Sequence, residues 1–111
     1  MARKYKNRKV TLDGHEFDSK REAARYVDLK QQQRQGKITD LVLQPSFELI
    51  PKQRRDDGKA ERNCVYIADF KYYDVGADRW VIEDAKGMRT RDYVVKRKLL
   101  LMVHGISVRE V

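Results

Sequence analysis

The stretch from Cys64 to Gly87 constrains the fold most, because its side chains alternate between two faces in two successive runs. A period of two residues is typical of β-strands. In the first run, one face carries Val65, Ile67, Asp69, Lys71 and Tyr73, and the other carries Cys64, Tyr66, Ala68, Phe70 and Tyr72. In the second run, one face carries Trp80, Ile82, Asp84 and Lys86, and the other carries Val81, Glu83 and Ala85. A turn at Gly76 and Ala77 joins the two runs, so the stretch predicts an antiparallel hairpin.

The register of this hairpin would bring two acidic residues together. If Tyr73 pairs with Trp80, Asp69 lies directly opposite Asp84. Such carboxylates have Cβ atoms roughly 5 Å apart, where like charges are destabilising. A shared proton, a cationic side chain or a bound metal ion offsets this repulsion. Lys86 supplies a cation on the same face, and paired carboxylates suit a hard ion such as Mg²⁺, so the pattern predicts a site.

Composition limits the size of the fold and the kind of partner. The 111 residues allow one compact domain, which we expect to span residues 9–111 after a flexible basic arm at residues 1–8. Lys and Arg number 25 against 17 Asp and Glu, which gives a formal charge of +8. This balance favours a polyanionic partner such as nucleic acid, although a basic protein without a specific partner has the same composition.

Several classes of protein are excluded by features that the sequence lacks. Cys64 is the single cysteine, so neither an intrachain disulfide nor a cysteine-based zinc site is possible. No apolar run is long enough for a membrane span or a signal-peptide core. The chain also carries no phosphate-binding glycine loop and no Ser-His-Asp pattern. We therefore expect a cytoplasmic protein with no membrane partner and no small-molecule cofactor.

A small hairpin and a helix are predicted before residue 37. Residues 9–17 alternate in polarity and turn at Asp13-Gly14. Ser19 and Glu22 fit a capping box, which predicts a helix from Ser19 to about Gly36. Residues 37–50 then predict a strand on either side of Gln44-Pro45, because proline requires an edge position or a bend.

Two further segments complete the prediction. Residues 51–63 are dense in charge and predict an exposed, mobile loop. Thr90 can cap a second helix that runs to about His104, and residues 106–111 predict a last strand. The apolar stripe of this second helix consists of Val95, Leu99 and Met102. Its run of residues 99–102 fits either a subunit interface or a buried helix.

These residues carry a resemblance to a known family. An aspartate on one strand, followed by Asp84-Ala85-Lys86 on the next, resembles the PD-(D/E)XK nuclease superfamily. The chain is more closely similar to its small phage-encoded endonucleases of the Holliday junction resolvase kind. The segments that carry this similarity are GHEFDSKREAARY, LQPSFEL, YIADF, VIEDAKG and a following T-x-x-Y-x-x-K. The family usually keeps a proline before the first acid, whereas this chain has Ile67-Ala68-Asp69.

The resemblance implies a fold and a function. The implied fold is of the α/β (α+β) class, with a restriction-endonuclease-like αβββαβ core and a mixed central sheet flanked by two helices, here preceded by an N-terminal hairpin. The implied function is an Mg²⁺-dependent DNA endonuclease, with Mn²⁺ as a substitute metal, that resolves four-way junctions as a homodimer. For a phage-encoded protein, the host cytoplasm is the implied location.

The resemblance also implies roles for individual residues. The expected metal ligands are Glu22, Asp69, Asp84 and the carbonyl of Ala85. Lys86 is expected to orient the attacking water and to stabilise developing negative charge, so the expected catalytic residues are Glu22, Asp69, Asp84 and Lys86. The residues expected to bind DNA are Gln44 and Lys96, which the resemblance places near the site, and Arg89 and Arg91, which stand at a helix N-terminus suited to a phosphate.

Simpler interpretations stand beside several of these roles. Glu22 fits a helix cap, the helix-borne acid of the site, or both at once, and Tyr26 and Leu29 on the same helical face favour the role in the site. Gln44 fits an ordinary polar loop residue equally well, and Lys96 a surface lysine with a buried stem. Glu83 points to the opposite face from Asp84, but a register slip of one residue would exchange the two.

Two other functions remain open from the sequence. The same chemistry suits a less selective DNA nickase or a nuclease that trims single strands. A non-catalytic basic module that binds nucleic acid, with its acids in structural salt bridges, belongs to a different class of protein.

Overall fold

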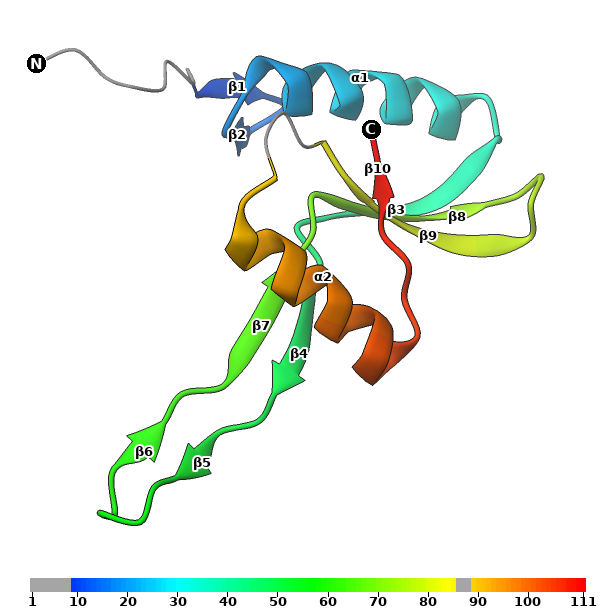
Figure 1. Ribbon diagram of the computed structural model, residues 1–111. Helices are drawn as coiled ribbons and strands as arrows, with labels where there is room; N and C mark the ends of the chain where they lie inside the picture. Colours follow the sequence, from blue (N-terminus) through cyan, green and yellow to red (C-terminus); the bar gives the residue numbers. More distant parts are fainter. Residues whose placement is uncertain (1–8, 86–88) are drawn as a thin grey trace, which may run out of the picture.

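Ten short strands and two helices are found in residues 9–85 and 89–111, which are the residues that the computed structural model describes (Figure 1). In chain order they are β1 (Val10–Leu12), β2 (His15–Phe17), α1 (Lys20–Arg34), β3 (Ile38–Leu43), β4 (Ser46–Ile50), β5 (Gln53–Arg54), β6 (Ala60–Glu61), β7 (Cys64–Ile67), β8 (Phe70–Asp74), β9 (Arg79–Asp84), α2 (Arg91–His104) and β10 (Arg109–Glu110). The protein is therefore of the mixed α+β class, as expected. The predicted basic arm, residues 1–8, lies outside the described residues.

The central sheet has the strand order β10-β9-β8-β3. Strands β3, β8 and β9 are antiparallel neighbours, and β10 joins the edge of β9 in parallel, so the sheet is mixed. Val81 of β9 packs into the apolar cluster under α1, whereas Ile82 packs into the cluster under α2. Strand β9 thus separates two cores, one on each face of the sheet.

Local sequence signals for the first hairpin and helix are confirmed. Strands β1 and β2 pair around Asp13 and Gly14, which have φ angles of 51° and 77°. Positive φ at both central residues suits the right-handed twist of a two-residue hairpin. The Ser19 hydroxyl accepts a hydrogen bond from the Glu22 N–H at 3.1 Å and so caps α1.

One long, bent hairpin runs from Ile38 to Asp74, and its outer end, which carries β5 and β6, extends away from the helices in Figure 1. Residues 51–63 continue this hairpin and include the short strands β5 and β6, so the prediction of a loop is wrong in part, although the segment is exposed as expected. A two-stranded ladder can form in a highly charged segment because its hydrogen bonds join backbone groups, while the charged side chains remain in solvent.

The bend of this hairpin lies at Gln44-Pro45 on one strand and at Ala68-Asp69 on the other. Gln44 has a φ of 52°, its N–H donates to the Asp69 carbonyl at 2.9 Å, and the Ala68 N–H donates to the Pro45 carbonyl at 3.1 Å. The bend divides the predicted first strand into β7 and β8. Tyr66 and Ala68 consequently pack under α2, whereas Phe70 packs under α1, so the uninterrupted alternation predicted across this point is wrong.

Helix α2 has the predicted ends but a different buried face. The Thr90 hydroxyl accepts the Tyr93 N–H at 3.1 Å, and Gly105 ends the helix with a φ of 69°. Tyr93 and Leu100 are buried, whereas Met102 of the predicted apolar stripe is 75% exposed. Apolar residues surround the second half of the helix, so their spacing alone does not specify a single face. The predicted last strand is shortened to β10.

Candidate functional site

Two aspartates face each other where β8 begins and β9 ends. The ladder pairs Tyr73 with Trp80 and continues to Phe70 and Glu83, which confirms the predicted register. The Asp69 N–H donates to Asp84 Oδ1 at 2.8 Å, and the Ala85 N–H donates to Asp69 Oδ2 at 2.7 Å. Each carboxylate thus accepts a main-chain donor from the opposite strand. These hydrogen bonds hold both carboxylates in place and offset part of their mutual repulsion.

Asp84 is completely enclosed, with an exposed fraction of 0%. Its second oxygen, Oδ2, accepts a hydrogen bond from the Tyr66 hydroxyl. Burial raises the pKa of Tyr66 above its ordinary value, and the hydrogen bond to Asp84 raises it further, so the hydroxyl remains a neutral donor. Sequence reasoning missed Tyr66, because uninterrupted alternation places it on the face opposite to Asp69. The bend before β8 brings it to Asp84.

Glu22 is buried on the inner face of α1. Its exposed fraction is 5%, and Tyr26 and Leu29 on the same face are buried as predicted. Among residues 9–85 and 89–111, no three His, Cys, Asp or Glu side chains form a group that could hold a metal ion. The structure therefore joins Asp69 and Asp84, and a role for Glu22 beside them stays a prediction.

Ala85 and Lys86 complete the acid-x-Lys motif. Ala85 is half-buried, and its N–H is bound to Asp69 Oδ2. Lys86, the predicted catalytic amine, lies outside the described residues.

Glu83 faces the opposite side of the sheet from Asp84, as predicted, so the alternative register is excluded. Its buried carboxylate binds Arg25 of α1 and accepts a hydrogen bond from the Tyr72 hydroxyl at 2.5 Å. The hydrogen bond to Glu83 is the main cause that raises the pKa of Arg25. Burial, followed by the hydrogen bond to Glu83, raises the pKa of Tyr72 to about 12. Glu83 therefore links α1 to the strand that carries Asp84.

Glu110 is an acidic neighbour of Asp84 that the sequence did not reveal. In the parallel ladder of β10 and β9, Glu110 is the partner of Asp84. Arg89 binds Glu110 at 2.6 Å, the Tyr93 hydroxyl donates to it at 2.7 Å, and Arg97 binds it at 3.1 Å. The Arg89 hydrogen bond, followed by that of Tyr93, lowers the pKa of Glu110 to about 2. No local pattern predicts this register, because β10 is separated from β9 by a helix.

The residues predicted to bind DNA lie in different surroundings. The main chain of Gln44 contacts that of Asp69, so Gln44 borders the aspartate pair, with its side chain exposed. Arg89 is exposed but held by Glu110. Arg91 is exposed at the N-terminus of α2, and Lys96 is half-buried in an ion pair with Asp92 at 3.7 Å. The structure thus brings Gln44 to the aspartates, whereas Arg89 and Lys96 are engaged by acidic side chains.

The chain is thus a mixed α+β protein in which a bent central sheet holds two opposed aspartates. It belongs to the family described as Protein of unknown function (DUF1064), whose sequence profile matches residues 2–109. No curated protein and no solved structure matches the chain significantly. Neither helix of the described residues has the length and apolar character needed to cross a membrane.

Proposed function

We propose that this protein is an Mg²⁺-dependent endonuclease that hydrolyses phosphodiester bonds of DNA. The observation that carries the proposal is the opposed pair Asp69 and Asp84, fixed by main-chain hydrogen bonds across two neighbouring strands of a basic protein. A like-charge pair is destabilising unless a bound cation, a shared proton or a cationic side chain offsets the repulsion. Functional sites hold their side chains in position through hydrogen bonds from neighbouring groups, as the two main-chain donors do here.

The donor set fits a magnesium ion. Mg²⁺ keeps several waters and is usually held by one or two carboxylates together with phosphate oxygens of the substrate, so two aspartates suffice. Hydrogen-bonded carboxylate oxygens retain a second lone pair for a metal. Bound Mg²⁺ lowers the pKa of water and stabilises charge on phosphoryl oxygens. Glu22 and the Ala85 carbonyl would complete the ligands, as the resemblance to PD-(D/E)XK nucleases implies.

The chain's own residues prepare this chemistry. Tyr66 and the Asp69 N–H hold the Asp84 carboxylate in one orientation. Lys86 follows Asp84 in sequence and would orient the attacking water and stabilise the phosphate charge. The helices and the strands of the central sheet follow one another in the order α1, β3, β8, β9, α2, β10, which agrees with the αβββαβ order of the superfamily and supports the same proposal.

The proposed substrate is a four-way DNA junction, cut by a homodimer in the cytoplasm. A chain of 111 residues has little surface for reading base sequence, so recognition by backbone and shape is expected. Exposed apolar residues on α2 suit a subunit contact, and they are Val95, Leu101, Met102 and Val103.

A non-catalytic basic module is the second candidate. The observation that favours it is the full burial of Asp84, whose two oxygens are both hydrogen-bonded within the chain. In that case the acids fix the bend of the sheet, and the protein binds nucleic acid through its positive charge alone.

Cleavage of labelled DNA separates the two candidates. Four-way junction, duplex and single-stranded DNA are incubated with the wild-type protein in Mg²⁺, in Mn²⁺ or in EDTA. We expect metal-dependent cutting, strongest on the junction. Binding without cutting in either metal would favour the non-catalytic module. Equal cutting of all three substrates would reject the junction and keep the nuclease.

A matched pair of variants tests the site itself. Asp84→Asn should abolish cleavage, because it removes the negative charge of one of the three proposed carboxylate ligands. Asp78→Asn makes the same chemical change at an exposed turn of the same hairpin and should cut like the wild type. Cleavage retained in Asp84→Asn would exclude the proposed site.

A further inference from the structure

An exposed aromatic pair stands on the same hairpin as the aspartates. Trp80 is 53% exposed and pairs across the ladder with Tyr73, with ring centroids 5.4 Å apart and an interplanar angle of 71°. The Lys71 amine lies 4.8 Å from the centre of the Trp80 ring. Leaving half of a tryptophan side chain in solvent is unfavourable, because the ring carries a large apolar area.

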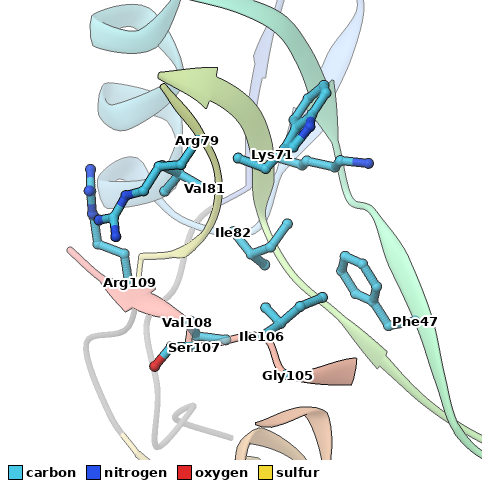
Figure 2. A pocket seen from close by; sticks show the side chains of 11 residues that line it. Phe47, Lys71, Arg79, Val81, Ile82, Gly105, Ile106, Ser107, Val108 and Arg109 are labelled. Carbon is cyan, nitrogen blue, oxygen red and sulfur yellow. The ribbon is translucent and has the colours of Figure 1, made fainter. Parts of the chain in front are cut away.

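A cavity of about 650 Å³ opens beside this pair, between β9 and the segment that follows α2. Figure 2 shows Arg79 and Arg109 at one end, Phe47 at the other, and Ile82 and Ile106 between them. The volume lies within the roughly 300–1,000 Å³ that small-ligand sites occupy. All charged residues among those that line it are basic, and they are Lys71, Arg79 and Arg109.

The cavity shares a face of the sheet with the proposed catalytic pair. Trp80, Ile82 and Asp84 occupy every second position of β9 and so lie on one face of the strand. Ile82 is paired with Lys71 across the ladder, which places Lys71 on the same face. Asp84 lies four positions after Trp80, which corresponds to about 13 Å along a strand. The aromatic pair therefore lies near the aspartates along β9, with the buried Ile82 between them.

We propose that Trp80, Tyr73 and Lys71 form a subsite that stacks an unpaired base of the nucleic acid, with an adjacent phosphate toward the amine of Lys71. The identity of the ligand as nucleic acid rests on the proposed function. Aromatic side chains stack on bases only where these are unstacked from their neighbours, whereas basic groups follow the backbone. The subsite thus selects DNA with a single-stranded or opened segment, such as the branch point of a junction.

Two alternative roles for this part of the hairpin predict different behaviour. In the first, Tyr73 and Trp80 serve only as a cross-strand pair that stabilises the hairpin. In the second, a strand of a partner protein pairs with the edge of β9. Among the described residues, β10 pairs only with Glu83 and Asp84, so the edge of β9 before Glu83 is open to such a strand. Neither role requires a basic lining or gives a preference for unpaired bases.

Intrinsic fluorescence reports on this subsite directly, because Trp80 is the single tryptophan of the chain. The full-length protein is titrated in EDTA with a short oligothymidylate and, separately, with a blunt duplex of equal length. We expect the oligothymidylate to quench Trp80 emission, and the duplex to quench it less at equal occupancy. Emission unchanged by bound oligothymidylate would overturn the proposal.

Variants separate stacking from hairpin stability. Fluorescence anisotropy of labelled oligothymidylate should show roughly tenfold or greater weakening for Trp80→Leu and little for Trp80→Phe, which keeps a π-face. Lys71→Gln should weaken binding more than the control Lys59→Gln, which removes the same charge in the turn between β5 and β6. Thermal unfolding of each variant is measured in parallel. Equal affinity of Trp80→Leu and wild type, or weakening only in variants that are unfolded, would overturn the subsite.

These measurements test the stacking subsite separately from DNA cleavage. Quenching by oligothymidylate without any Mg²⁺-dependent cleavage would keep the subsite and reject the nuclease. Cleavage of junction DNA without quenching or loss of affinity in Trp80→Leu would keep the nuclease and reject the subsite.

Discussion

The guanidinium of Arg25 in α1 donates two hydrogen bonds to the buried carboxylate of Glu83 in β9, from Nε to Oε1 at 2.5 Å and from Nη2 to Oε2 at 2.9 Å. Glu83 directly precedes Asp84, and Glu22 lies one helical turn before Arg25. This ion pair therefore fixes the helix that carries Glu22 against the strand that carries Asp84. Its planar, two-bond geometry restricts both rotation and sliding of the helix.

Removing Arg25 should destabilise the fold strongly. Arg25→Ala leaves the Glu83 carboxylate, which is 0% exposed, without its cation. Breaking one partner of a buried pair costs about 3–5 kcal/mol, a large part of a typical domain's stability. Urea unfolding followed by circular dichroism measures the loss. Arg55→Ala, which breaks an exposed ion pair with Asp57, is the control and should cost less than about 1 kcal/mol. Equal losses in the two variants would contradict the structural role of Arg25.

Stability should depend on the ionisation of Glu110 in acid. Its pKa is lowered from 4.5 to about 2 in the folded protein, chiefly by the Arg89 hydrogen bond. The stabilisation from the carboxylate is therefore complete above pH 4.5 and disappears as the pH falls toward 2. The melting temperature of wild type should exceed that of Glu110→Gln near neutral pH, and the difference should shrink across this window.

The same scan on Glu61→Gln provides the control for Glu110. Glu61 forms only an exposed ion pair with Arg55, at 3.6 Å, so this variant should differ little from wild type at any pH. A wild-type advantage over Glu110→Gln that persists unchanged to pH 2 would show that the charge on Glu110 contributes nothing.

Asp69→Asn should separate stability from activity. The asparagine oxygen can still accept the Ala85 N–H, whereas the charge opposite Asp84 is removed, so we expect an unchanged or higher melting temperature. Mg²⁺ should raise the melting temperature of wild type through binding to the native state, and this rise should be lost in the variant together with DNA cleavage. A large destabilisation with no change in the Mg²⁺ response would instead assign Asp69 a purely structural role.

Tyr66→Phe should weaken both the fold and the site. The change leaves Asp84 Oδ2 without the hydroxyl donor, and an unsatisfied buried acceptor costs about 1–3 kcal/mol. Loss of a group that orients a metal ligand typically lowers affinity or activity by about 10–100-fold. Tyr26→Phe removes a comparable hydrogen bond, to Asp13 at 2.8 Å, and should leave cleavage unchanged. Equal cleavage by both variants would reject the link between Tyr66 and the site.

Self-association should depend on the exposed side of α2. Met102 is 75% exposed, and Met102→Lys places a charge in the proposed subunit contact. Sedimentation equilibrium should show a dimer for wild type and weaker association for this variant. Val27→Lys, at a 52% exposed position of α1, should associate like wild type. A monomeric wild-type protein, or equal effects of both changes, would exclude a dimer through α2.

Features that depend on neighbouring residues could be predicted well. Ser19 and Thr90 cap the two helices, and Asp13-Gly14 turns the first hairpin, because each uses a side chain or a φ angle within four residues of its partner. The register that opposes Asp69 and Asp84 also followed from the sequence, since one short turn connects their strands. The assignment of function to these acids stays a prediction.

The remaining features depend on contacts between distant segments. Tyr66 reaches Asp84 only because the chain bends at Gln44-Pro45 and reverses the face of the strand beside it. Glu110 lies beside Asp84 only because β10 returns to the sheet after a helix. The sequence by itself thus determined the helices, the turns and the opposed aspartates, through short-range hydrogen bonding and alternation. Tertiary structure alone decided which groups surround those aspartates, because bends and edge pairing are fixed by the packing of both cores against β9.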